Sequence, residues 1–385
     1  MESVEGLIMA FNNIYRNKTV LVTGHAGFKG SWLSFWLKEM GAKVIGYSLI
    51  PDTEETMYRV LDLEHKLDAS IIADIRDETK LNEVFAKYQP EIVFHLAAQP
   101  LVRLSYSEPV QTYETNIIGT LKVLEAARKT PSVKAFVNVT TDKCYENKER
   151  KEGYREDEPM GGYDMYSSSK GCSEILSSSY RRSFLTDGKP FALGTGRAGN
   201  VIGGGDWAKD RLIPDCIRAF NKGETVFIRN PYATRPWQLV LEPLAGYLRL
   251  GQKLLENGSK YAQGYNFGPE MNKDVKVCEV AKLAAEVWGN NAKVEVGTGD
   301  GLHEANLLQL NVEKAERELG IKPVYSAETA IKKTTEWYKA FYNGNTDMTA
   351  YSRQQLHDFI IAAQAKELEW AESTQTENIT YKLAV

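Results

Sequence analysis

Short β-branched apolar runs alternate with amphipathic stretches over the first half of the chain. Five runs predict strands: KTVLVTG (18–24), AKVIGYS (42–48), SIIADI (70–75), EIVFHLAA (91–98) and AFVNVTTD (135–142). Helical spacing separates them in SWLSFWLKEMG, ETKLNEVFAKYQ and the long VQTYETNIIGTLKVLEAARK. Because a parallel strand needs a helical crossover before it, this pattern predicts an α/β fold with a doubly wound parallel sheet.

Composition narrows the class of protein. The 385 residues carry a formal net charge of −4, with 43% hydrophobic and 25% charged residues, and the Lys and Arg residues are spread along the chain. We expect no nucleic-acid or membrane partner, because there is no basic footprint and no apolar run near the roughly 20 residues of a membrane span. The cysteines form no C-x-x-C pair, which predicts a cytoplasmic chain without disulfides or a bound metal: Cys144, Cys172, Cys216 and Cys278.

The end of the first predicted strand carries a glycine pattern. The strand runs into TGHAGFKGSW, where Gly24, Gly27 and Gly30 recur at intervals of three and Phe28 and Lys29 lie between the last two. Gly24 permits a tight turn, Gly27 lets the backbone approach a pyrophosphate, and Gly30 lets the helix pack close to the strand. This strand, turn and helix context predicts a dinucleotide site in a Rossmann domain.

The ribose end of this predicted site lacks one group. An Asp or Glu normally ends the second strand roughly 20 residues past the glycines, but here the strand ends in YSLIP, with Ser48 in place and Asp52 too late. No Arg is present there for a 2′-phosphate, so the sequence favours NAD over NADP, with a weak ribose clamp. Asp74 and Ile75, after the third strand, are expected at the adenine, although Asp74 is equally suited to cap the next helix.

A second cluster of reactive side chains follows the fifth strand. TTDKCY (140–145) places Thr141, Asp142 and Lys143 at a carboxyl strand end, where doubly wound sheets bind ligands. Further on, YDMYSSSKG places Tyr166 and Lys170 four residues apart, on one face of a helix start. An ammonium one turn away, together with a cationic nicotinamide, is expected to lower the pKa of the phenol and let it act as a base.

Together these motifs resemble the extended short-chain dehydrogenase/reductase family over nearly the whole chain. The matching stretches are the TGxxGFxG loop, HLAAQ (95–99), the region of Asn116, the pair Tyr166 and Lys170, and RAGNVIG (197–203). Within that family the sequence is similar to nucleotide-sugar 4,6-dehydratases, and above all to those that act on CDP-glucose. This finer likeness rests on GFKGSWLSFWL, AAQPLVRLSY, TTDKCY, GGYD, RAGNVIGGGDWAKDRLIPD and IRNPYATRPWQLVLEPLAGYL.

The resemblance implies NAD as the cofactor and CDP-glucose as the substrate. The implied cofactor contacts are Gly24, Gly27, Phe28, Lys29, Gly30, Asp74, Ile75, Leu96, Ala97, Ala98, Gln99, Asn116, Tyr166 and Lys170. The implied substrate contacts are Gln99, Arg103, Asn200, Arg211, Arg235 and His303. Trp207 and Trp237 either stack on the base or pack in the core. Met165 and Leu239 depart from the family pattern, where Pro and His are expected.

The resemblance also implies the chemistry. Tyr166 would take the proton of the sugar 4-hydroxyl while hydride passes from C4 to NAD, with Thr141 on that oxygen and Lys170 on the ribose. The 4-ketone acidifies C5, and loss of the C5 proton and the C6 hydroxyl gives an enone to which hydride returns at C6. Asp142 matches the acid for the leaving hydroxyl, but Lys143 stands where related dehydratases carry Glu. Lys143 is a neutral base, a charged stabiliser of the enolate, or a bystander beside water or Tyr166.

The sequence is compatible with three functions. The first is the CDP-glucose 4,6-dehydratase reaction or the same reaction on a dTDP, UDP or GDP sugar. An epimerase or reductase on the same scaffold is the second, and Asp142 argues against it because C4 epimerisation needs no acid for a C6 hydroxyl. A catalytically silent NAD-sensing scaffold is the third, and the intact Thr141, Tyr166 and Lys170 argue against it.

The predicted organisation has two lobes. The Rossmann domain spans 16–200 with a returning segment at about 234–262, and the substrate lobe comprises 201–233 and 263–345. Residues 346–385 are expected to form a helix followed by a loosely held tail. In the resembling family the helix near 109–129 and the one after Tyr166 pair across subunits, so a homodimer or homotetramer is expected.

Overall fold

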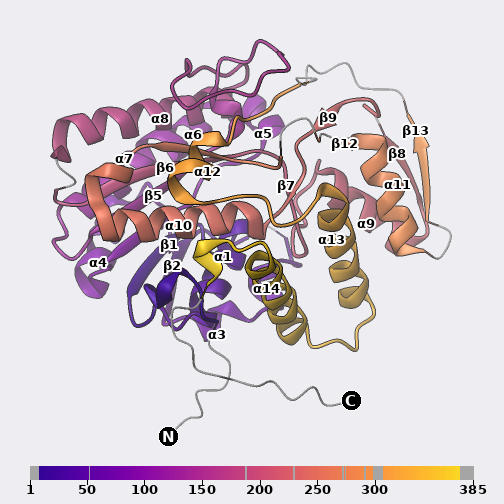
Figure 1. The fold of residues 1–385 in the computed structure, drawn as a ribbon, viewed down its shortest axis with the longest axis horizontal. Coiled ribbons are helices and arrows are strands. Elements are labelled where there is room, and N and C mark those ends of the chain that lie inside the picture. Colours follow the sequence, from indigo (N-terminus) through magenta and orange to yellow (C-terminus); the bar gives the residue numbers. More distant parts are fainter. Residues whose placement is uncertain are drawn as a thin grey trace, which may run out of the picture.

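A seven-stranded parallel sheet forms the centre of the molecule (Figure 1). The computed structural model describes residues 8–51, 53–186, 189–228, 230–270, 273, 275–289, 292–297 and 307–372. Its sheet has the order β11-β6-β5-β4-β1-β2-β3, and neighbouring strands are parallel throughout. The strands are β1 (Thr19–Thr23), β2 (Lys43–Ser48), β3 (Ala69–Ile72), β4 (Ile92–His95), β5 (Ala135–Val139), β6 (Ala192–Ala198) and β11 (Gly264–Phe267).

Helices cover both faces of this sheet (Figure 1). Successive side chains of a strand point to opposite faces, so Val20 and Val22 of β1 pack into one apolar cluster and Leu21 packs into the other. The first cluster contains buried residues of α1 and α10, and the second contains those of α4 and α7. The predicted doubly wound fold is confirmed. The helices of these layers are α1 (Phe28–Glu39), α4 (Glu78–Tyr88), α7 (Thr120–Arg128), α8 (Met165–Phe184) and α10 (Leu241–Asn257).

The strand order reverses between β1 and β4, and the ligand crevice of a doubly wound sheet opens at such a point. Three segments follow β1, β4 and β5. They are the loop of residues 24–30 that carries the three glycines (the glycine loop), residues 96–99, and the TTDKCY turn at residues 140–145. Parallel strands end at the same edge of a sheet, so the topology brings all three segments together.

The predicted long helix near 109–129 is interrupted. It divides into α6 (Pro109–Tyr113), a π-helical turn (Glu114–Gly119) and α7. The wider turn contains Asn116, whose amide is fully buried against the segment after β4. Single π turns of this kind widen a helix where a functional residue must be aimed. Apolar spacing does not register one extra residue in a turn, so the sequence predicted a continuous helix.

A smaller lobe covers the carboxyl edge of the sheet (Figure 1). β8 and β13 pair in parallel, β9 and β12 pair antiparallel, and β7 pairs with β10. β11 lies within the range 263–345 predicted for this lobe, yet it completes the central sheet. Its four residues, GYNF, are too short a run to assign from sequence. The elements are β7 (Val201–Ile202), α9 (Leu212–Lys222), β8 (Thr225–Ile228), β9 (Thr234–Arg235), β10 (Gln238–Leu239), β12 (Val275–Lys276), α11 (Val277–Trp288), β13 (Lys293–Val296), α12 (Glu313–Leu319) and α13 (Ala327–Tyr342).

The C-terminal helix α14 (Met348–Ala365) packs back on the N-terminal part of the sheet domain. Arg353 Nε donates to Glu39 Oε2 at 2.7 Å, and the Trp370 ring stacks on Phe11 with centroids 5.2 Å apart. The predicted tail falls mainly on 373–385, outside the described residues. Short helices complete the chain: α2 (Met57–Val60), α3 (Leu63–Lys66) and α5 (Val102–Ser107).

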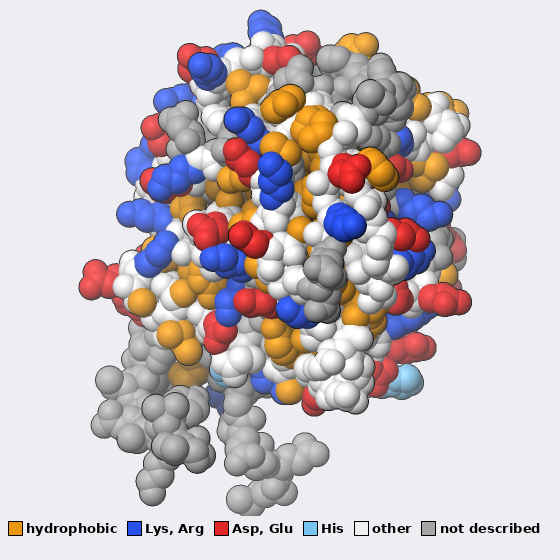
Figure 2. Space-filling model, turned by 90° about the vertical axis from the view of Figure 1, so that its right-hand side faces the viewer, with side chains coloured by type: hydrophobic (Ala, Val, Ile, Leu, Met, Phe, Trp, Pro, Cys, Tyr) orange, Lys and Arg blue, Asp and Glu red, His pale blue; other side chains and the backbone are white. Residues whose placement is uncertain are grey.

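The surface carries mixed charge. On the face drawn in Figure 2, acidic and basic side chains of the described residues are interspersed. Within the described ranges, no helix combines the length and apolar character of a membrane span.

Candidate active site

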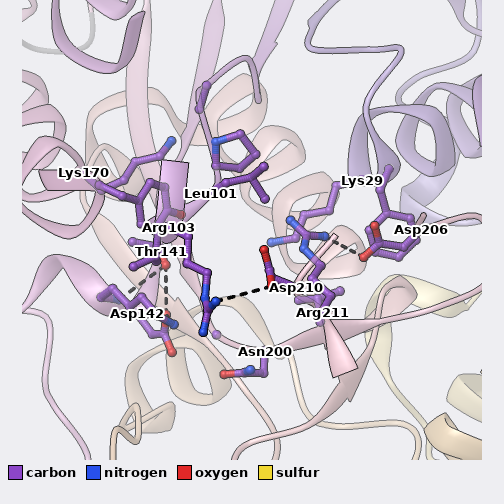
Figure 3. Close-up of a pocket in the computed structure, with 18 of the residues that line it drawn as sticks. Lys29, Leu101, Arg103, Thr141, Asp142, Lys170, Asn200, Asp206, Asp210 and Arg211 are labelled. Atoms are coloured by element: carbon purple, nitrogen blue, oxygen red, sulfur yellow. Dashed lines mark hydrogen bonds and ion pairs between the residues drawn. The ribbon is translucent and has the colours of Figure 1, made fainter. Parts of the chain in front are cut away.

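A cavity of about 1620 Å³ lies between the carboxyl edge of the sheet and the smaller lobe. Its walls come from the glycine loop, the ends of β3, β4, β5 and β6, and α8, together with parts of the smaller lobe. In the view of Figure 3, Thr141, Asp142 and Lys170 lie on one side of it, and Lys29 and Arg211 lie on the other. The cavity therefore joins the two clusters that the sequence singled out.

The glycine loop has the close packing that a dinucleotide requires. Gly24 has φ +76°, and a Cβ there would lie 2.7 Å from the Ala97 nitrogen. A Cβ on Gly30 would lie 2.0 Å from the Gly24 oxygen, so only glycine lets α1 start this close to β1. No side chain caps α1 at Gly27, which leaves the amides of its first turn available to an anion. The loop thus fits a dinucleotide diphosphate.

The adenosine end of the cavity is lined by Ser48, Asp74 and Ile75. Burial alone would raise the pKa of Asp74, but hydrogen bonds from Arg76 outweigh it and hold that pKa below its ordinary value. The guanidinium Nη2 lies 2.7 Å from Asp74 Oδ2. Asp77, whose side chain accepts from the Lys80 amide at 3.0 Å, caps α4. The alternative role of Asp74 as that cap is therefore wrong, and its adenine contact stays a prediction.

Residues 96–98 line the cavity, but Gln99 and Asn116 lie behind its wall. Asn116 Oδ1 accepts from the Gln99 amide at 2.8 Å, and its Nδ2 donates to the Gln99 carbonyl at 3.1 Å. The Gln99 side chain donates to Thr112 Oγ1 at 2.9 Å and accepts from the Leu101 amide at 2.5 Å. Both side chains are thus occupied in holding the loop. The structure favours a supporting role over the predicted direct contacts with cofactor or substrate.

Thr141, Asp142 and Lys143 form the start of a tight turn after β5. Thr141 Oγ1 donates to Asp142 Oδ1 at 2.9 Å, and Lys143 Nζ lies 3.7 Å from the same oxygen. Asp142 Oδ2 is buried and has no hydrogen-bond partner among the described residues. A buried carboxylate oxygen without a partner is costly unless a ligand completes it. All three side chains line the cavity.

Tyr166 and Lys170 follow one another on the inner face of α8. Burial raises the pKa of Tyr166 to about 12, although a hydrogen bond with Thr141 and the charge of Arg211 act against it. Burial also lowers the pKa of Lys170 to about 8, and its ammonium donates to the Val139 carbonyl at 3.2 Å. Burial of the phenol therefore has the largest effect on its pKa, and the lowering expected from Lys170 together with a cationic nicotinamide stays a prediction.

Lys29 extends from the first turn of α1 into the same space. Its Nζ lies 5.9 Å from the centre of the Tyr247 ring, and it makes no hydrogen bond or ion pair with any residue the structure describes. Burial, together with the neighbouring charge of Arg211, lowers the pKa of Lys29 to about 8, although the charge of Asp142 acts against this shift. An ammonium without a hydrogen-bond or ion-pair partner among the described residues, placed in the first turn of α1, is a group suited to an anion.

The predicted substrate residues within the described ranges, Gln99 apart, also line this cavity. Arg211 Nη1 is 2.6 Å from Asp206 Oδ2, and Arg103 Nη1 is 3.7 Å from Asp210 Oδ1 (Figure 3). These arginines, Asn200 and Arg235 all line the cavity, and the buried Asn200 Oδ1 has no partner among the described residues. The two aspartates were missed from sequence, because nothing in the spacing marks them as partners. His303 lies outside the described residues.

Trp207 and Trp237, the two aromatic residues considered for stacking on the nucleotide base, lie in different surroundings. Trp207 is buried, and its ring packs edge-on against Trp337, Tyr338 and Phe341, which assigns it to the core. Trp237 is also buried, although it lines the cavity. Phe227 on β8 is 63% exposed and lines the cavity, so its ring is open to a ligand. The sequence signal for Phe227 was an aromatic at an outward position of a short strand.

A family model described as GDP-mannose 4,6 dehydratase matches residues 21–334. The chain belongs to the GDP-mannose 4,6 dehydratase family. One relative, the CDP-glucose 4,6-dehydratase of Salmonella typhimurium, is 47% identical over 359 residues and covers 92% of this chain and 99% of its own length. The predicted family resemblance is thereby confirmed.

Two further comparisons set this GDP-mannose 4,6 dehydratase family member in context. The dTDP-glucose 4,6-dehydratase of Salmonella typhimurium is 27% identical over 83% of this chain and 92% of its own length. The crystal structure of the Thermotoga maritima UDP-glucose 4-epimerase with UDP-glucose has a TM-score of 0.71 at 26% identity, covering 83% of this chain and 98% of the epimerase.

Proposed function

We propose that this chain is a CDP-glucose 4,6-dehydratase. It converts CDP-D-glucose to CDP-4-dehydro-6-deoxy-D-glucose and water, an early step of deoxysugar synthesis. The observation that carries the proposal is the 47% identical CDP-glucose 4,6-dehydratase that matches over nearly its full length. The cavity supplies what the reaction needs, with Tyr166, Thr141 and Asp142 on one wall.

The residues that would hold NAD are those of the glycine loop, the segment 96–98, Ser48, Asp74 and Ile75. The loop fits a diphosphate because its two tight glycines and uncapped helix leave room and amide donors for one. Bound there, NAD would supply hydride acceptance from C4 and hydride return to C6. The missing ribose carboxylate shifts more of the binding energy to the diphosphate.

Tyr166 is proposed to take the proton of the 4-hydroxyl. The hydrogen bond with Thr141 and the charge of Arg211 both lower its pKa, and a cationic nicotinamide adds to that effect. Thr141 would hold the 4-oxygen, and Lys170 would hold the ribose. All four side chains line one cavity, so each can reach a ligand without rearrangement of an element.

Asp142 and Lys143 are proposed to carry the elimination. Asp142 lines the cavity, and its buried Oδ2 has no partner among the described residues, which supports a role in protonating the C6 hydroxyl as it leaves. Lys143 Nζ lies 3.7 Å from Asp142 Oδ1 and lines the cavity, which disfavours the bystander role. It serves either as the base for the C5 proton or as the charge that stabilises the enolate.

The substrate diphosphate and base are proposed to lie on the smaller lobe. Arg103, Arg211 and Arg235 converge on the cavity, and guanidinium groups bind phosphate oxygens in pairs. Phe227 is an exposed ring that lines the cavity there and suits a pyrimidine face. The preference for cytosine over thymine, uracil or guanine rests on the relative and not on a base contact.

A homodimer is proposed from an apolar strip on three neighbouring helical segments. Val110 is 69% exposed, Ile118 46% and Ile175 56%, and they lie on α6, the π turn and α8. These segments pack against one another, so a second copy could bury the strip. A homotetramer and a cytoplasmic location stay predictions.

The test is an assay of the purified protein with NAD and each of CDP-, dTDP-, UDP- and GDP-glucose. The expected result is an alkali-induced absorbance of a 4-keto-6-deoxy product, fastest with CDP-glucose. A faster reaction with another sugar nucleotide would reassign the substrate. Conversion to a C4 epimer, or no reaction with any of the four, would overturn the proposal in favour of the epimerase or scaffold activities.

A further inference from the structure

The turn at residues 140–145, which bears Thr141 and Asp142, is held by hydrogen bonds at both of its ends. Thr140 Oγ1 donates to Glu174 Oε1 at 2.5 Å, just ahead of Thr141. At the other end, the Tyr145 hydroxyl accepts from Arg197 Nη1 at 2.6 Å and donates to Asn266 Oδ1 at 2.7 Å. The two anchors leave little freedom to the residues between them.

One buried ion pair supplies both anchors. Arg197 Nη2 lies 2.9 Å from Glu174 Oε2, and the two residues are only 5% and 2% exposed. Glu174 also accepts from Thr195 Oγ1 at 2.8 Å, so its carboxylate is bonded to β6 as well as to the segment after β5. Arg197 lies over the Tyr145 ring, with 5.1 Å from the guanidinium carbon to the centroid.

Glu174 belongs to the helix that carries the other half of the site. Tyr166, Lys170 and Glu174 follow one another at intervals of four on α8, which places them along one helical face. Movement of Glu174 relative to the turn would therefore also move Tyr166 relative to Thr141.

We infer that Glu174 and Arg197 are positioning residues that hold the turn bearing Thr141 and Asp142 in register with the helix bearing Tyr166 and Lys170. The inference rests on the proposed dehydratase function. Neither side chain lines the main cavity, so neither touches the substrate in this account. They act through Thr140 and Tyr145.

A purely structural role is the competing explanation. Buried ion pairs can often be replaced by apolar residues with no loss of stability, whereas removal of one partner leaves a costly buried charge. Stability alone therefore does not distinguish the two roles, and the experiment must separate folding from turnover.

The first comparison uses Glu174→Gln and the milder Thr140→Val. Both should lower kcat, by about 100-fold and about 10-fold, with KM for CDP-glucose changed less than about threefold, because a small misplacement of reacting groups costs turnover more than binding. Glu369→Gln is the matched control, since it removes the carboxylate partner of the buried Arg249, and neither residue lines the cavity. It should lower the melting temperature without changing kcat.

The second comparison uses the double variant Glu174→Gln/Arg197→Met. Removal of both charges should restore the melting temperature toward that of the wild type, while kcat stays low. Recovery of both kcat and the melting temperature would overturn the inference, and it would assign Glu174 and Arg197 a purely structural role.

The pH profile gives an independent readout. The charge of Glu174 raises the pKa of Lys170 against the effect of burial, and the other titratable groups that face Lys170 are Cys144, Lys29 and His95. Glu174→Gln should therefore shift the alkaline limb of kcat to lower pH. Thr140→Val keeps the carboxylate and should leave the limb in place.

Amide hydrogen exchange separates this inference from the proposed function. Glu174→Gln and Thr140→Val should speed exchange in residues 140–145 whether or not the wild type acts on CDP-glucose. Unchanged exchange there, or a kcat within twofold of the wild type in both single variants, would overturn the inference. Absence of product from the wild type alone would overturn only the proposed function.

Discussion

Thr141 Oγ1 donates a 2.9 Å hydrogen bond to Asp142 Oδ1, and this leaves the buried Oδ2 as the free oxygen of that carboxyl group. The bond distinguishes the two oxygens of this carboxyl group. It also ties the residue that would hold the 4-oxygen to the residue that would protonate the C6 hydroxyl. The two steps of the proposed reaction thus share one short segment of backbone.

Asp142→Asn should abolish most of the elimination. An amide of the same shape cannot give up a proton to the leaving hydroxyl, so kcat should fall about 10²–10⁴-fold with little change in CDP-glucose affinity. Product formation and calorimetric binding measure the two quantities. Asp157→Asn, an exposed site, is the control. A retained kcat in Asp142→Asn would remove this residue from the chemistry.

Lys143→Gln and Lys143→Arg should separate the two roles of this lysine. Gln removes both the base and the charge, so solvent deuterium should enter C5 at least about 10²-fold more slowly. Arg keeps the charge but cannot accept the proton at neutral pH. Exchange retained in the Arg variant assigns an electrostatic role, and exchange lost in it assigns the base. Normal exchange in the Gln variant would return Lys143 to a bystander.

Lys29→Met should weaken binding of the cofactor. The unpaired ammonium stands in the first turn of the phosphate-binding helix, and loss of one charge-assisted hydrogen bond costs about 10–100-fold in affinity. Titration with NAD, ADP-ribose and adenosine tests this. The first two ligands should weaken alike and adenosine should not change, because it lacks the diphosphate. Lys38→Met, at the other end of α1, should bind NAD normally, and equal NAD affinity in Lys29→Met would contradict the account.

Glu242 should make folding stability depend on pH. Burial raises its pKa from 4.5 to about 7. Because the folded state holds this proton more tightly, the stabilisation is complete below pH 4.5 and is lost as the pH rises through about 7. The loss amounts to about 3 kcal/mol. Urea unfolding of the wild type and of Glu242→Gln between pH 5 and 8 measures it. The Gln variant should show a flatter profile, and equal slopes would contradict the prediction.

The parts of the site that sequence predicted well are those fixed by local geometry. The glycine spacing, the strand-end position of Thr141 and Asp142, and the helical spacing of Tyr166 and Lys170 each depend on a few adjacent residues. The parallel sheet then brings those segments to one edge, so their meeting in one cavity follows from topology.

The parts that sequence could not predict depend on burial and on partners distant in the chain. The balance of burial and charge at Tyr166 depends on Thr141, Asp142 and Arg211, which come from segments of the chain other than that of Tyr166. The Asn116 side chain is hydrogen-bonded to the backbone of Gln99. These two residues come from different segments, which meet only in the folded chain. Spacing along the chain carries neither kind of information.

The most direct test of the central claim uses CDP-glucose labelled with deuterium at C4. The purified protein with NAD is expected to give CDP-4-dehydro-6-deoxy-D-glucose in which the label has moved to C6 of the same molecule, with solvent hydrogen at C5. Mass spectrometry and NMR of the product would show it. Loss of the label to solvent, its retention at C4, or its appearance in released cofactor would contradict an internal C4-to-C6 transfer.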